Sequence, residues 1–130
     1  MNFVELFNRS YEENVHAEED AFFEQFAENL QEASDLIGSF CSPQDKSLVE
    51  DTLLLLLDFA AHRKGNEALK RLAMSQARAG IGPDFYDVWM ATLLKTVAQL
   101  DPNFRWEDAL AWRVMLAPGI EFMKHYKPYA

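Results

Sequence analysis

The chain has little cysteine, no long apolar run and no basic leader. Its 130 residues include one cysteine, Cys41, which has no partner for an internal disulfide and is typical of a protein kept in a reducing cytoplasm. The longest apolar run, Leu53–Leu57, is far shorter than the roughly 20 residues that span a bilayer. The first residues resemble no signal peptide. The sequence therefore predicts a cytoplasmic protein without a membrane span.

Positive charge is also scarce. The chain carries 12 Lys and Arg against 21 Asp and Glu, a net charge of −9, and its acidic residues concentrate between Glu12 and Glu32. Such a surface repels phosphate backbones and anionic membranes, so nucleic acid is not an expected partner. The acidic stretch lacks the ligand spacing and turn glycine of a calcium loop. It is interpreted as a solvated helix face, and no metal site is predicted.

Signatures of catalysis are missing as well. The sequence contains no nucleophile–base pair, metal-ligand cluster or glycine-rich phosphate loop at a usable spacing. The chain is therefore predicted not to be an enzyme.

Helical periodicity is what the sequence has in abundance. Apolar residues recur at the 3.6-residue period over most of the chain, strand signals are nearly absent, and glycine, proline and serine mark the breaks. Residues 1–130 are thus expected to form a single all-α domain, with a kink at Pro118 inside the last helix. The expected helices cover about residues 3–11, 22–37, 84–100 and 106–126. Between them, one helix starts at Ser42-Pro43, carries its apolar face over residues 48–59 and ends near Arg63, and the next is capped by Asn66 and carries its apolar face over residues 69–77.

The segment around Gln76 is the most informative one. Leu69, Leu72, Ala73 and Gln76 stand at i, i+3, i+4 and i+7, which places a primary amide on a face that otherwise belongs to the core. A buried amide without a partner costs roughly 1–3 kcal/mol. Gln76 is therefore expected to bind a backbone carbonyl, a water, Tyr86 or a bound molecule.

The pattern Leu-Ala-x-x-Gln-x-x-x-Gly-Ile-x-Pro-x-x-Tyr-x-x-Trp, which ends at Trp89, resembles the proximal half of a bacterial single-domain globin. Phe22-Phe23-x-x-Phe26 and the segment from Ala111 to Ile120 extend the resemblance over most of the chain. It implies a globin-like helical sandwich of about six to eight helices. It also implies a pocket between the 48–59 and 69–77 helices, which holds haem in ordinary members. Gln76 stands where the family has its iron-binding histidine.

Haem is the cofactor that this resemblance brings into question. Globin iron is held by imidazole, and a glutamine amide offers only a weak carbonyl donor. None of the three histidines, His16, His62 and His125, falls on the face of Gln76. No cofactor is therefore expected, and the alternative is haem with an atypical axial ligand such as Lys46. The residues assigned to the pocket are Gln76, Phe40, Leu72, Phe59, Leu48 and Trp89, although the aromatic ones also fit an ordinary core.

Three functions follow from these features. The first is a sensory or regulatory domain that has lost haem and binds another apolar or amphipathic small molecule. The second is a haem-binding oxygen sensor or carrier with atypical ligation, and the third is a protein-interaction module with a filled core. A homodimer is also expected from surplus apolar residues in the last two helices, namely Met90, Leu94, Val114 and Met115.

Overall fold

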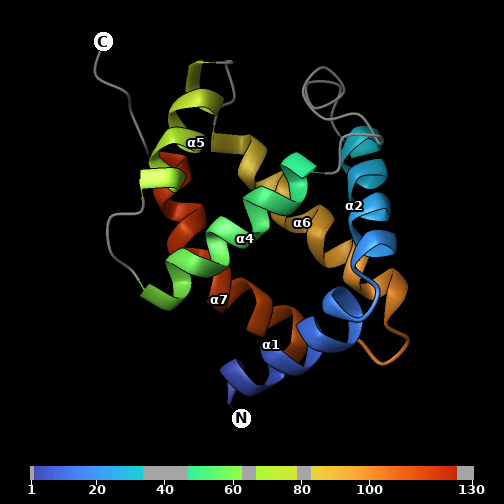
Figure 1. Ribbon diagram of the computed structural model, residues 1–130. Coiled ribbons are helices and arrows are strands. Elements are labelled where there is room, and N and C mark those ends of the chain that lie inside the picture. The colour runs from blue at the N-terminus through green and yellow to red at the C-terminus, as the bar shows by residue number, and fades with distance from the viewer. Residues whose placement is uncertain (1, 34–46, 63–66, 79–82, 126–130) are drawn as a thin grey trace.

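The computed structural model describes residues 2–33, 47–62, 67–78 and 83–125, and for residues 47–50, 61–62, 77–78 and 83 it describes the helical backbone alone. These residues form six α-helices and one π-helical turn, with no strand among them (Figure 1). The all-α prediction is confirmed. In chain order the elements are α1 (Phe3–Tyr11), η1 (Glu12–His16), α2 (Glu19–Ala33), α4 (Ser47–His62), α5 (Glu67–Arg78), α6 (Pro83–Leu100) and α7 (Trp106–His125).

The core lies where α7 meets three other helices. Helices α1, α4 and α6 all pack on α7, and α2 packs on α6 (Figure 1). The side chains that fill these contacts come from the apolar positions of the helical repeat. Among the most deeply buried are Phe22, Phe26, Leu53, Leu93 and Leu116.

Helix α7 crosses α4 closely at Gly119. A Cβ added to Gly119 would lie 2.5 Å from Cδ2 and 3.4 Å from Cα of Leu56. Glycine therefore allows the two backbones to approach at a point that a larger side chain would hold apart. Pro118 lies inside α7 at the preceding position, as the sequence predicts.

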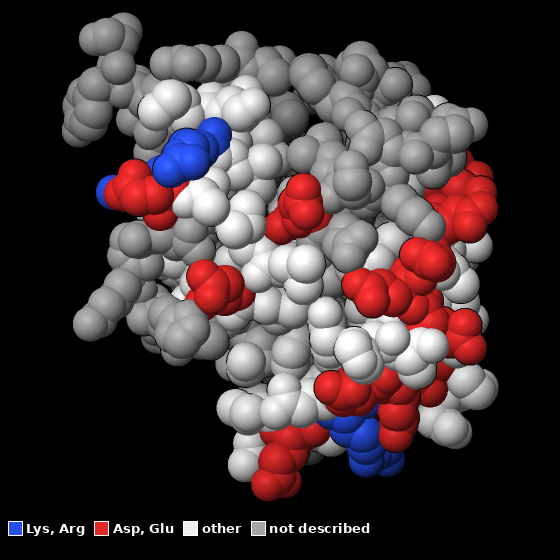
Figure 2. All heavy atoms as spheres, viewed as in Figure 1, with Lys and Arg blue, Asp and Glu red and all other residues white. Residues whose placement is uncertain are grey.

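Every acidic side chain between Glu12 and Glu32 is exposed, whereas the apolar side chains of the same stretch, such as Phe22 and Phe26, are buried. Figure 2 shows acidic side chains gathered over α2 and the turn that precedes it. The interpretation as a solvated helix face is confirmed. Among the residues that the structure describes, no group of three or more His, Cys, Asp or Glu could hold a metal ion.

Three details differ from the sequence-based expectations. The helical period puts Ala33 on the same inner face of the expected 22–37 helix as Phe22 and Phe26, but Ala33 is exposed at the end of α2. Met90 and Leu94, expected as surplus surface, are buried within the chain because α6 is covered by both α2 and α7. The π-helical turn η1 was not expected from the sequence.

Candidate functional site

The inward face of α5 carries the residues that the sequence singles out. Leu69 and Ala73 are buried, and Leu72 and Gln76 are partly buried on the same face. The spacing i, i+3, i+4, i+7 has thus placed all four on one side of the helix, as predicted. Helix α5 lies next to α4, so this face is one wall of the predicted pocket.

Gln76 has a protein partner. The Tyr86 hydroxyl donates a hydrogen bond of 2.5 Å to Oε1 of Gln76, and it joins α5 to the first part of α6. Tyr86 was one of the partners that the sequence left open. Burial raises the pKa of Tyr86 to about 12, so the hydroxyl remains a neutral donor at physiological pH. The hydrogen bond satisfies the amide oxygen without any ligand.

The other predicted pocket residues do not all meet at Gln76. The Trp89 ring packs edge-on against Phe26 of α2, at a centroid distance of 5.3 Å, and is buried in the core. The Phe59 ring faces Phe122 of α7 at 5.5 Å. Both aromatic rings therefore have protein neighbours, as an ordinary core would provide.

Two more predicted pocket residues cannot be placed against Gln76. Phe40 and the side chain of Leu48 lie outside the described residues, although the backbone of Leu48 belongs to α4. The predicted pocket between α4 and α5 therefore stays a prediction.

The histidines whose side chains are described lie far along the chain from α5 and are exposed. His16 ends the η1 turn, and His125 ends α7, where its Nε2 lies 3.1 Å from a carboxylate oxygen of Glu121. The side chain of His62 lies outside the described residues. Neither described histidine is on α5, the helix where the globin resemblance requires an iron ligand.

The buried tyrosine gives the protein a predicted pH dependence. The pKa of Tyr86 is about 12 in the folded state and about 10 in the unfolded state, so the folded state keeps the phenol proton up to a higher pH. The free energy of unfolding should therefore fall between pH 10 and 12, by at most about 2–3 kcal/mol from this group. Urea denaturation across that range, compared with Tyr86→Phe, measures the difference. If the free energy of unfolding fell equally with pH in both proteins, the raised pKa of Tyr86 would be contradicted.

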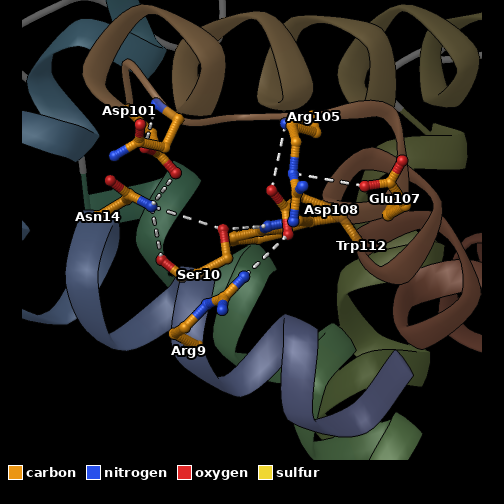
Figure 3. A network of polar contacts seen from close by, with 9 residues as sticks. Arg9, Ser10, Asn14, Asp101, Arg105, Glu107, Asp108 and Trp112 are labelled. Atoms are coloured by element: carbon orange, nitrogen blue, oxygen red, sulfur yellow. Dashed lines mark hydrogen bonds and ion pairs between the residues drawn. The ribbon is translucent and has the colours of Figure 1, made fainter. Parts of the chain in front are cut away.

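A second polar cluster connects α1 and η1 to the segment between α6 and α7 and to the first part of α7 (Figure 3). The Trp112 Nε1–H donates to Oγ of Ser10 at 2.9 Å, and Ser10 and Trp112 are both buried. Nδ2 of Asn14 donates to the backbone oxygen of Ser10 at 3.0 Å and to Oδ2 of Asp101 at 3.1 Å. These hydrogen bonds link α1 to α7 and the π-helical turn to the segment between α6 and α7.

Asp108 completes this cluster. Its Oδ2 accepts from the backbone N–H of Arg105 at 3.2 Å, which is one of the two hydrogen bonds of a capping box at the start of α7. Its Oδ1 lies 3.7 Å from Nη2 of Arg9 and has no hydrogen-bond partner among the described residues. This cluster was not predicted from the sequence. Asp108, three residues after the N-cap of α7, is a helix-start signal that the sequence contains. The pairing of Asn14 with Asp101, which are 87 positions apart, has no such local signal.

A hollow of about 560 Å³ adjoins this cluster. Two arginines, Arg9 and Arg105, and three carboxylates, those of Glu13, Asp101 and Asp108, line it. Both arginines already pair with carboxylates, Arg9 with Asp108 and Arg105 with Glu107, so neither stands as a lone cation that would attract an anion. We therefore assign it a structural role at the junction of α1 and α7.

No helix within the described ranges is long and apolar enough to cross a membrane.

Comparison with known proteins identifies the architecture. No protein-family model and no curated protein sequence matches the chain. A solved structure from Pseudomonas aeruginosa, described as structurally highly homologous to a human hemoglobin, matches with a TM-score of 0.77 and 26% sequence identity. The match covers 95% of this chain and 96% of that one. Because the likeness extends over nearly the whole of both chains, the fold is an all-α, globin-like one.

Proposed function

We propose that this chain is a globin-fold domain in which Gln76 has replaced the iron-binding histidine, and that it serves as a haem-free sensory or regulatory domain. The observation that carries the proposal is the hydrogen bond between Gln76 and Tyr86 on the inward face of α5. It gives a protein partner to the amide oxygen, the atom of Gln76 that could bind iron, and takes up one of its two lone pairs. The proposal assigns the domain no reaction.

The described residues do not fit a globin-type haem. Iron in a globin takes a neutral imidazole nitrogen, and the two described histidine side chains, His16 and His125, are exposed on other elements. A pocket beside α5 would instead offer apolar surface from partly buried groups such as Leu72 and Phe59. Surface of this kind suits an apolar or amphipathic molecule, with a few polar groups to orient it.

Absorbance of the purified protein tests the absence of haem. We expect a colourless protein that shows no strong Soret band when haemin is added. Stoichiometric haem binding by the unaltered chain would overturn the haem-free proposal. It would favour the alternative of an oxygen-binding domain with another axial ligand.

Filling the proposed pocket with a larger side chain tests whether the domain binds a small molecule there. An environment-sensitive apolar dye should bind the unaltered protein, and Leu72→Trp should weaken that binding at least about tenfold because the larger ring occupies the space beside α5. Ser75→Trp, at an exposed position of the same helix, is the matched control and should bind the dye as before. Dye binding that is missing, or equally affected by both changes, would instead favour an interaction module with a filled core.

A further inference from the structure

Helix α7 presents an apolar stripe to solvent. Trp106, Leu110 and Val114 follow one another at i, i+4 and i+8, and they are 69%, 37% and 43% exposed. This spacing puts them on one side of the helix, over a length of roughly 12 Å. The opposite side of α7, with Ala111 and Trp112, is buried against the rest of the chain.

The charges around the stripe differ from those of the chain as a whole. The protein carries a net charge of −9, and its acidic residues gather on η1 and α2. Next to the stripe, Arg113 is exposed, and at the start of α7 the exposed Arg105 pairs with Glu107, whose side chain is only 16% exposed. Two copies of this acidic chain can therefore approach each other here without bringing exposed carboxylates together.

The stripe is also complementary to itself. Trp106 and Arg113 are seven residues apart, so they lie on the same edge of α7, two turns from each other. If two α7 helices lie antiparallel across a two-fold axis, each Arg113 comes to lie over the partner's Trp106, and the two Leu110 side chains meet near the centre. A guanidinium over an indole ring is a favourable cation–π pair, because tryptophan is the best ring acceptor and arginine the more frequent cation.

We propose that the outer face of α7 binds a second copy of this chain through such an antiparallel, two-fold contact. This inference does not depend on the small-molecule pocket. It replaces the interface expected from the sequence, of which Met90 and Leu94 are buried within one chain. Because a contact made by one helix is small compared with about 800 Å² per partner in a stable interface, the dimer is weak and depends on concentration.

Analytical ultracentrifugation of matched variants tests the interface. The average mass of the unaltered protein should rise above 15.0 kDa as its concentration increases. Leu110→Glu should raise the dissociation constant at least about tenfold, because it places two carboxylates at the centre of the contact. Leu54→Glu is the control, since Leu54 is similarly exposed, at 43%, but lies on α4. It should change the dissociation constant less than about twofold.

Tryptophan fluorescence gives a second readout. Of the three tryptophans, Trp89 and Trp112 are buried, so Trp106 dominates quenching by acrylamide. Quenching should decrease as the unaltered protein dimerises and should stay constant for Leu110→Glu. Circular dichroism of each variant shows whether it is folded. A chain that remains monomeric over the whole concentration range would overturn the proposal, and so would a dimer that Leu110→Glu and Leu54→Glu weaken equally.

Discussion

Replacing Gln76→His should convert a colourless protein into one that binds haem with the spectrum of a histidine ligand. The substitution places an imidazole on the inward face of α5, where Gln76 is partly buried beside Ala73. Imidazole is the axial ligand that globins use, whereas the amide oxygen of glutamine is a weak donor. A haemin titration followed by visible absorbance measures the gain.

The control for this experiment is Ser75→His. Ser75 precedes Gln76 on the same helix but is exposed, so an imidazole there points away from the core. This variant should remain colourless. If Gln76→His also remains colourless, either the space beside α5 is filled or Gln76 does not face it, and the proposed small-molecule pocket loses its support. That result would leave the proposed α7 interface untouched.

Replacing Trp112→Ala should lower the free energy of unfolding by about 3–5 kcal/mol. The indole is fully buried, it packs edge-on against Phe7 at a centroid distance of 4.8 Å, and its Nε1–H donates to Ser10. The alanine leaves a cavity between α1 and α7 and a buried hydroxyl without its donor. Urea denaturation at low protein concentration, where the proposed dimer is dissociated, measures the loss.

Two further variants separate packing from hydrogen bonding at this position. Ser10→Ala retains the indole but removes its acceptor, so it should cost only about 1–3 kcal/mol. Trp106→Ala, on the same helix but at an exposed position, should change stability by about 0.5 kcal/mol or less. If Trp112→Ala were no more destabilising than Trp106→Ala, the packing of α1 on α7 described above would be wrong.

The sequence was sufficient to predict most helices because their signal is local. The 3.6-residue repeat of apolar side chains, with proline at Pro83 and the Asp101-Pro102 pair as boundaries, placed α6 and α7 closely. The same repeat placed Gln76 on the inward face of α5. It did not indicate η1, since that turn depends on bonds from Asn14 to Ser10 and to Asp101, a residue far along the chain.

The sequence by itself determined the helical class, the acidic solvated surface and the side of α5 on which Gln76 lies, because each depends on residue type and on a short-range period. Only the tertiary structure decided what those faces touch. It selected Tyr86 as the partner of Gln76 and placed Trp89 against Phe26. It also buried Met90 while leaving Trp106 exposed. The physical reason is that a period gives the direction of a side chain, whereas burial depends on which helix packs over it.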